Sequence, residues 1–159
     1  MGSDFIPQEG SCPCQSNTYM INRKPIARFI CHCTICQEFT GQPFNDVTVL
    51  LKSDISDLNL IRTKFRRWKL PPNISRGLCS CCSKPSIEMA LGRNLIMIPT
   101  TNYPDAAALP KPTMHIFYNR RVEDRDDDLP KYSGAIHSQA AIMKTLTQGM
   151  LKRATKKVN

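Results

Sequence analysis

Long apolar segments are missing from this sequence of 159 residues, and aromatic residues are scarce. No run of eighteen apolar residues occurs, so the sequence offers no candidate for a membrane-spanning helix. Only 7% of the residues are aromatic, including one tryptophan, and this predicts a modest hydrophobic core. In a chain of single-domain length, crosslinking by metal ions would then contribute more to stability than it does in a larger core.

A secretory leader is also missing from the first ten residues. They include Asp4 and Glu9 and have neither a basic start nor an apolar stretch, so we expect a cytoplasmic protein without a membrane contact. A reducing cytosol disfavours disulfides, and the eight cysteines are grouped at the short spacings of metal sites. Metal binding is therefore the preferred interpretation of the cysteines, and a disulfide framework is the alternative.

The chain has no internal repeat and no low-complexity segment, and twelve prolines interrupt helical continuity. Short runs of β-branched and aromatic residues are separated by turn residues, which predicts a mainly β fold of short antiparallel strands. We expect strands at 18–22, 26–30, 47–51, 58–62, 74–78, 87–91, 95–98 and 113–118.

Two helices are predicted. The first is short, from about Thr34 to Thr40, and Gly41 ends it. The second runs from about Ser138, as its N-cap, to about Lys152.

Apolar residues at intervals of four, Ile142, Leu146 and Met150, should dock the second helix on the domain. We expect Gly149 and the basic tail to fray its end. The sequence thus predicts a zinc-binding β domain over residues 1–137, with a C-terminal helix and basic tail over 138–159 docked on the same domain.

The formal net charge of +9 would attract an anion, such as a nucleic acid or a small acidic substrate. The charge is concentrated in two basic runs and opposed by one acidic block, and solvated surface is the simpler interpretation of each. The first basic run is Arg62, Lys64, Arg66, Arg67 and Lys69, the second is Lys152, Arg153, Lys156 and Lys157, and the acidic block is Glu123, Asp124, Asp126, Asp127 and Asp128.

The cysteines lie in three short segments, 12–14, 31–36 and 79–82. Zinc prefers four ligands at tetrahedral corners and accepts thiolates, so loops with two or three cysteines are natural parts of zinc sites. The segment 31–36 offers three thiols, enough to hold one ion with a corner open to water or substrate.

The other two segments together can form a closed four-thiolate site that ties the N-terminal segment to the middle of the chain. Its ligands would be Cys12, Cys14, Cys79 and Cys82. The spacing leaves the division open, because Cys81 could instead close a site with Cys31, Cys33 and Cys36, giving two structural zinc ions and no chemistry. His32 is a weaker candidate ligand because it lies between two expected ligands.

The motifs around these cysteines resemble the glutathione-dependent formaldehyde-activating enzyme family, which includes centromere protein V. The resemblance covers roughly Glu9 to Ser133, and several motifs occur in the family's order. The matching segments are Gly10-Ser11-Cys12-Pro13-Cys14, Cys31-His32-Cys33-Thr34-Ile35-Cys36 with Gly41, Pro43 and Phe44, Arg76-Gly77-Leu78-Cys79 through Cys82, His115-Ile116-Phe117 and Asp128-Leu129-Pro130-Lys131-Tyr132.

The resemblance implies a β-tent of small antiparallel sheets around two zinc ions per chain. It implies that Cys12, Cys14, Cys79 and Cys82 hold a structural zinc ion, and that the catalytic residues Cys31, Cys33 and Cys36 hold a reactive one. Cys81 is then an extra thiol. The implied activity is that of a carbon–sulfur lyase acting on thiol–aldehyde adducts, such as S-hydroxymethylglutathione formed from glutathione and formaldehyde.

Three features depart from the family's pattern. Glycine usually follows the second cysteine of the first and last pairs, where this chain has Gln15 and Ser83, so a left-handed turn there would be strained. Gln37 replaces a basic residue that is common after the third reactive cysteine, and the tryptophan usual in the C-terminal segment is absent from 122–124. These changes bear on the substrate rather than on the zinc sites.

The leading hypothesis is thiol activation. Glutathione would fill the open position of the reactive zinc ion, lose its proton there, and attack the aldehyde carbon or leave in the reverse direction. Arg76 and the first basic run could attract the carboxylates of glutathione.

The alternative hypothesis is a zinc-stabilised binding module without catalysis that contacts nucleic acid or protein. The positive charge favours it, but the few aromatic residues do not alternate with the basic ones as a single-strand stacking platform requires. The oligomeric state does not follow from the sequence.

Overall fold

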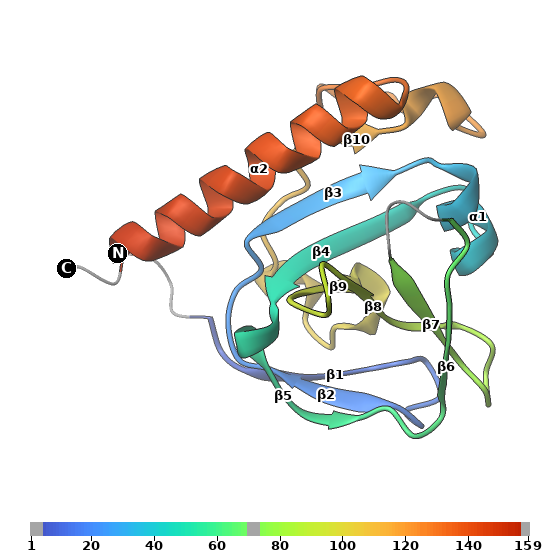
Figure 1. Cartoon of the computed structure of the whole chain (residues 1–159), viewed down its shortest axis with the longest axis vertical. Coiled ribbons are helices and arrows are strands. Elements are labelled where there is room, and N and C mark those ends of the chain that lie inside the picture. The colour runs from blue at the N-terminus through green and yellow to red at the C-terminus, as the bar shows by residue number, and fades with distance from the viewer. Residues whose placement is uncertain (1–4, 70–73, 157–159) are drawn as a thin grey trace. The chain divides into compact units, whose positions relative to one another are not determined.

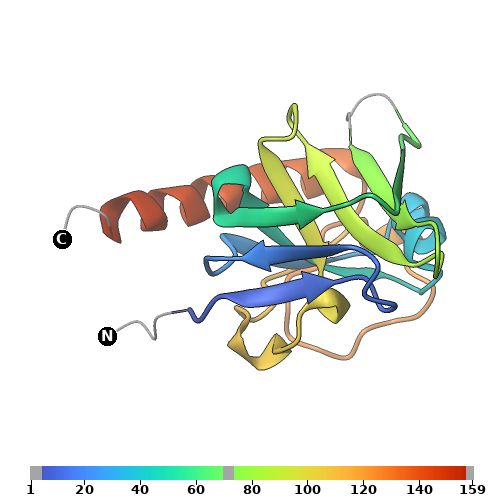
Figure 2. The ribbon, with the colours of Figure 1, turned by 90° about the horizontal axis from the view of Figure 1, so that it is seen from below.

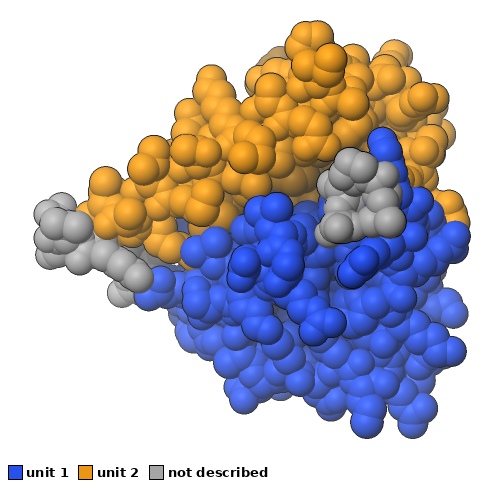
Figure 3. All heavy atoms as spheres, in the orientation of Figure 1, with its two compact units in different colours: residues 1–25, 48–110 blue, residues 26–47, 111–159 orange. Residues whose placement is uncertain are grey.

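The computed structural model describes residues 5–69 and 74–156, and the chain divides into two compact units (Figure 3). The first unit comprises residues 1–25 and 48–110, and the second comprises residues 26–47 and 111–159. The predicted mainly β fold, with a short helix near 34–40 and a C-terminal helix, is confirmed. No helix in the described ranges combines the length and hydropathy that a membrane span requires.

Antiparallel pairing organises the first unit (Figures 1 and 2). One three-stranded sheet has the order β1 (Gln8–Ser11), β2 (Thr18–Ile21) and β5 (Ile55–Asn59). A second set of antiparallel neighbours has the order β9 (Leu95–Pro99), β8 (Pro85–Ala90), β7 (Ser75–Cys79) and β6 (Thr63–Arg66). Short 3-10 turns occur at Lys52–Asp54, Thr100–Asn102 and Ala106–Ala108.

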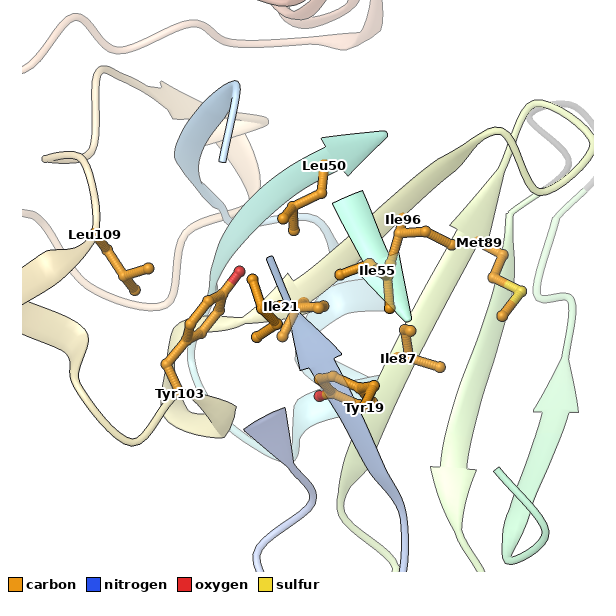
Figure 4. Close-up of a cluster of buried hydrophobic side chains, with 10 residues drawn as sticks. Tyr19, Ile21, Leu50, Ile55, Ile87, Met89, Ile96, Tyr103 and Leu109 are labelled. Atoms are coloured by element: carbon orange, nitrogen blue, oxygen red, sulfur yellow. The ribbon is translucent and has the colours of Figure 1, made fainter. Parts of the chain in front are cut away.

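The apolar cluster of the first unit includes two tyrosines, whose hydroxyls have hydrogen-bond partners. Tyr19 Oη donates to the Ser86 carbonyl over 2.9 Å, and Tyr103 Oη lies 2.6 Å from Thr48 Oγ1. Burying each large aliphatic side chain stabilises the fold by about 1.5–3 kcal/mol. The cluster, shown in Figure 4, consists of Tyr19, Ile21, Leu50, Ile55, Ile87, Met89, Ile96, Ile98, Tyr103 and Leu109.

The second unit is built on β3 (Ala27–Cys31), which pairs in parallel with β10 (His115–Ile116). Strand β4 (Asn45–Leu51) begins in this unit and ends in the first. Helix α1 (Thr34–Thr40) ends as predicted at Gly41, whose φ is 66° and whose N–H donates to the Gln37 carbonyl over 2.9 Å. A 3-10 turn follows β10 at Tyr118–Arg120.

The C-terminal helix α2 (Ala135–Lys156) runs along β3 (Figure 1) and begins earlier than the sequence predicted. Ser138 is not its N-cap but a fully buried residue within the helix. Its Oγ accepts a hydrogen bond from the Phe117 N–H over 2.8 Å and donates to the Tyr132 carbonyl over 3.3 Å. The hydroxyl therefore joins the helix to the segment after β10 instead of starting the helix.

The predicted fraying at Gly149 is wrong, because α2 continues to Lys156. A Cβ atom at position 149 would lie 2.3 Å from the Ile26 carbonyl oxygen, so glycine allows the helix to approach the start of β3 closely. Leu146 is buried as predicted, whereas Met150 is 42% exposed. The buried face follows Ser138, Ala141 and Leu146 instead of the predicted interval of four.

Two predicted strands are shorter or displaced. The chain turns within 58–62, where the Thr63 N–H donates to the Leu60 carbonyl over 2.9 Å and separates β5 from β6. The strand expected at 113–118 is reduced to the two residues of β10. Strands β1 and β6 were not predicted. The division into residues 1–137 and 138–159 stays a prediction, and Lys157 of the basic tail lies outside the described residues.

Candidate metal-binding sites

The first candidate site is the four-sulfur cluster of Cys12, Cys14, Cys79 and Cys82, whose Sγ atoms all lie within 4.8 Å of one another. Cys14 Sγ is 3.7 Å from Cys12 Sγ and 3.6 Å from Cys79 Sγ. With zinc–sulfur bonds of about 2.3 Å, the edge of a tetrahedral site is about 3.8 Å. All eight cysteines are described and none forms a disulfide. The sulfur positions therefore fit a closed zinc site.

Two hairpin turns with matching hydrogen bonds present these sulfurs. The Cys12 N–H donates to the Asn17 carbonyl over 3.2 Å, and the Cys79 N–H donates to the Lys84 carbonyl over 2.9 Å. In both hairpins the bond joins the first cysteine to the residue five positions later. Each turn is thereby closed by its own backbone, between β1 and β2 and between β7 and β8.

The residues after the second ligand of each turn adopt the left-handed conformation, with φ of 61° at Gln15 and 58° at Ser83. Their N–H groups donate to the carbonyls of Cys12 and Cys79, each over 2.9 Å. A side chain at such a φ costs about 1–2 kcal/mol compared with glycine. The strain expected at these two positions from the missing glycines is therefore present.

Ionisation of the four thiols is uneven. Hydrogen bonds from Ser16 lower the pKa of Cys14 to about 6. Burial raises the pKa of Cys79, but hydrogen bonds from the Cys82 and Cys81 backbones outweigh it and the pKa is lowered overall. Burial raises the pKa of Cys12 and raises that of Cys82 to about 11. A bound divalent cation would favour the thiolate at all four positions.

The second candidate site is the three-sulfur cluster of Cys31, Cys33 and Cys36, whose Sγ atoms also lie within 4.8 Å of one another. Cys31 ends β3, Cys33 is the N-cap of α1, and Cys36 lies within that helix. Cys31 and Cys36 are buried, whereas Cys33 is half-buried. Within the described ranges no other cysteine, histidine or carboxylate completes the cluster, so three donors suit a tetrahedral ion with one open corner.

The thiols of this cluster affect one another's ionisation. The hydrogen bond with Cys33 and burial together raise the pKa of Cys31 far above its usual range. Cys33 Sγ accepts a hydrogen bond from the Cys36 N–H over 3.3 Å, which orients this sulfur at the start of α1. Without a cation Cys33 opposes the ionisation of Cys31, and a bound zinc ion would favour the thiolate form. The donor set therefore fits zinc.

A chain of polar side chains, two buried and two half-buried, adjoins the three-sulfur segment. His32 Nε2 lies 2.8 Å from His115 Nδ1, and both imidazoles are almost completely buried. His115 Nε2 donates to Asp127 Oδ2 over 2.9 Å, and Lys131 Nζ donates to Asp127 Oδ1 over 3.0 Å. Lys131 and then His115 hold the pKa of Asp127 well below its usual range. Because Cys31 and Cys33 flank His32, this chain holds the backbone between two candidate ligands.

Aromatic rings and cations surround His32. Its ring is 5.7 Å from that of Phe44 and meets the Tyr118 ring edge-on at 5.2 Å, measured between ring centroids. Burial, followed by the charges of His115, Arg125 and Arg121, lowers the pKa of His32 to about 4. His32 is therefore neutral at physiological pH, and it belongs to neither sulfur cluster.

Gln37 holds the backbone of His32, between two candidate ligands. Its Nε2 donates to the His32 carbonyl over 2.7 Å and to the Arg120 carbonyl over 2.8 Å. The glutamine thus links the start of α1 to the 3-10 turn after β10.

The structure brings together the seven cysteines that the sequence grouped, and it leaves the exposed Cys81 outside both clusters. Arg76 was expected to attract a substrate, but it is buried and its Nε lies 3.0 Å from Glu88 Oε2. The sequence reasoning missed the roles of His115 and Asp127, although His115 lies in one of the motifs shared with the family. Its position beside His32 depends on the parallel pairing of β10 with β3.

A mainly β fold that gathers one set of four thiols and one set of three has cysteine clusters that could hold metal ions, as zinc-binding proteins do. The chain belongs to the glutathione-dependent formaldehyde-activating enzyme family, whose sequence model matches residues 7–120. The matched range includes both cysteine clusters and His115, and it ends before Asp127. A comparison with curated proteins gave no match.

Proposed function

We propose that the chain is a zinc-dependent carbon–sulfur lyase that catalyses the reversible addition of a thiol, most simply glutathione, to formaldehyde. The single observation that carries this proposal is the three-sulfur cluster, which has no fourth donor among the described residues and has one half-buried member, Cys33. In this proposal the four-sulfur cluster holds a structural zinc ion, and Cys31, Cys33 and Cys36 hold the reactive one.

The proposed reaction makes or breaks one carbon–sulfur bond. In the addition direction the thiol loses its proton, its sulfur bonds to the carbonyl carbon, and the carbonyl π electrons move to oxygen, which takes up a proton. Reversal breaks the carbon–sulfur bond and releases aldehyde and thiol. A zinc ion held by Cys31, Cys33 and Cys36 would supply a lowered pKa for the substrate thiol.

The chain's own contribution is to keep the three sulfurs in place. The imidazole of His32 is held by His115, and its carbonyl is held by Gln37. Cys31 and Cys36 are buried, whereas the half-buried Cys33 is the member that an incoming thiol could approach. Such fixed geometry lowers the cost of bringing the thiol and aldehyde together.

The proposal is tested by following exchange between free and thiol-bound carbon-13 formaldehyde by NMR, because the adduct also forms without an enzyme. We expect the zinc-loaded protein to accelerate this exchange with glutathione. Cys33→Ser should lose the acceleration, and Cys81→Ser, which changes an exposed thiol outside both clusters, should keep it. A parent protein that gives the exchange rate of buffer would contradict the proposal.

A second candidate function, binding of single-stranded nucleic acid, is favoured by the surface of β6. This strand exposes Lys64, Phe65 and Arg66, and the Arg66 guanidinium carbon is 4.6 Å from the centroid of the Trp68 ring. Basic and aromatic side chains therefore alternate along this strand, contrary to the sequence prediction, as they do in sites that bind single-stranded nucleic acid. The same charged residues have a second explanation, because β6 is the edge strand of its sheet and charges on an edge strand protect it from aggregation.

Binding to β6 is tested by fluorescence anisotropy of a labelled oligonucleotide at several salt concentrations. This second function predicts salt-dependent binding that falls in a Lys64→Ala, Arg66→Ala double variant. An unchanged affinity in that variant would exclude β6 as the binding surface.

A further inference from the structure

We infer that Arg125 is an anion-binding residue beside the three-sulfur cluster and that it receives a carboxylate of the substrate thiol. This inference rests on the proposed function and adds a specificity determinant to it. Arg125 lies beyond the range that matches the family, so the family match does not assign it a role.

Phe44 links Arg125 to the cluster. The Arg125 guanidinium carbon is 4.9 Å from the centroid of the Phe44 ring, and that ring also contacts the imidazole of His32. His32 lies directly between Cys31 and Cys33 in the chain. The guanidinium is therefore one aromatic ring away from the segment that carries two of the three sulfurs.

The backbone of Arg125 is fixed from the same side. Its N–H donates to the Tyr118 hydroxyl over 2.8 Å, and the Tyr118 ring packs against both His32 and His115. Arg125 is thus held where it can act on a molecule bound at the three sulfurs.

Arg125 also lacks a counterion. Among the described residues no carboxylate lies within salt-bridge distance of its guanidinium, although it is half-buried. Of the acidic residues close in sequence, Asp124 pairs with Arg121, and Asp127 pairs with His115 and Lys131. Asp126 is exposed and forms no salt bridge with Arg125. The Phe44 ring replaces only part of the hydration that the guanidinium loses on burial.

These features suit a thiol that carries a carboxylate. A guanidinium binds a carboxylate through two parallel hydrogen bonds, which an aromatic ring does not provide. Glutathione has two carboxylates, whereas 2-mercaptoethanol has none. Arg125 should therefore select for acidic thiols, and the buried Arg76, which has Glu88 as a partner, should have no part in selection.

The test measures binding of glutathione and of 2-mercaptoethanol to the zinc-loaded protein by calorimetry. Arg125→Gln should weaken glutathione binding about 10- to 100-fold, the usual effect of losing a charged hydrogen bond, and leave 2-mercaptoethanol binding unchanged. Arg125→Lys keeps the charge without the bidentate geometry and should lose less. Arg120→Gln is the matched control, because that side chain is exposed and the hydrogen bonds of Arg120 to Gln37 and Phe117 are made by its backbone.

The outcomes separate this inference from the proposed function. Equal weakening of both thiols by Arg125→Gln, or no weakening of glutathione, would overturn the inference while the proposed function stands. A parent protein that binds neither thiol would overturn the proposed function and this inference with it. If thermal unfolding shows that Arg125→Gln is unstable, Arg125→Lys provides the test. The inference would be overturned if this variant had the same ratio of glutathione affinity to 2-mercaptoethanol affinity as the parent protein.

Discussion

The two cysteine clusters differ in their number of sulfurs and in what holds them. The four-sulfur cluster is presented by two hairpin turns that close through their own backbone hydrogen bonds. The three-sulfur cluster lies between a strand end and a seven-residue helix, and side chains from distant parts of the chain support it. A site formed by local turns suits a structural ion. A site supported by a polar network suits a reactive ion, because its ligands must stay in place while a substrate binds and leaves.

The arginines of the two units show the same contrast. Arg76 in the first unit is buried in an ion pair with Glu88, at positions that face each other across β7 and β8. Arg125 in the second unit stacks on Phe44 and has no carboxylate partner in the described ranges. The first arginine stabilises the fold, and we propose that the second binds the substrate.

Replacing one ligand in each cluster should give the largest difference. We expect Cys79→Ser to lose a zinc ion and the folded state, since structural zinc contributes on the order of 10 kcal/mol to small domains. Cys33→Ser should also lose one zinc ion but remain folded. Metal analysis together with circular dichroism measures both effects. Equal collapse of the two variants would mean that both clusters are structural.

Removing the buried partner of Arg76 should give the next largest effect. Glu88→Gln should destabilise the protein by about 3–5 kcal/mol, because it leaves a buried guanidinium without a counterion. A double variant, Arg76→Met with Glu88→Leu, should recover most of that loss. Urea unfolding measures stability, and glutathione binding serves as the second readout. Weaker binding by the stable double variant would show that Arg76 contributes to substrate recognition after all.

Changes in the histidine chain should act on the three-sulfur cluster alone. Asp127→Asn should weaken its zinc affinity about tenfold, as expected for a residue that orients ligands through others, and leave the four-sulfur cluster unchanged. Asp126→Asn, at an exposed neighbouring carboxylate, is the control. Competition with a zinc chelator measures both affinities. A loss shared by the two clusters would indicate general destabilisation instead.

Asp127→Asn should also alter the pH dependence of the protein's stability. Lys131 and His115 lower the pKa of Asp127, so its contribution is present above the ordinary carboxyl pKa of about 4 and is lost as pH falls below it. The thermal midpoint of the parent should therefore fall faster than that of Asp127→Asn below about pH 4. Parallel curves would contradict the ionised role of this carboxylate.

Local features of the fold and sites were predictable from the sequence. Cysteine spacing grouped Cys31, Cys33 and Cys36, Gly41 marked the end of α1, and the missing glycines indicated strain at Gln15 and Ser83. Each of these features depends on residues a few positions apart. Short-range patterns are sufficient for them because turn geometry and ligand spacing are local properties.

Features that depend on long-range pairing were not predictable. His115 is 83 positions from His32, and only the pairing of β10 with β3 brings the two rings together. The Arg76 and Glu88 pair depends on a strand register that shifts between Gly77 and Leu78. Ser138 had a good N-cap sequence, but its tertiary hydrogen bond to the Phe117 N–H placed it inside α2.

Relieving the strained turns should give the smallest effect. Gln15→Gly and Ser83→Gly should each stabilise the protein by about 0.5–1 kcal/mol, because the gain from a relaxed left-handed φ exceeds the backbone entropy that glycine loses. Thermal unfolding of the zinc-loaded variants measures the change. Ser80→Gly, in the same loop but not among the positive-φ residues, should be destabilising or neutral. A loss of stability in both turn variants would show that the Gln15 and Ser83 side chains are needed in these turns.

The central claim is that one cluster is closed by four sulfurs while the other keeps a position open to an outside thiol. Cadmium-113 NMR of protein loaded with cadmium at both sites tests it most directly, because the resonance responds to the number of bound sulfurs. We expect two resonances, of which only the one lost in Cys33→Ser moves when glutathione is added. Two resonances that both stay unmoved by saturating glutathione would contradict the claim.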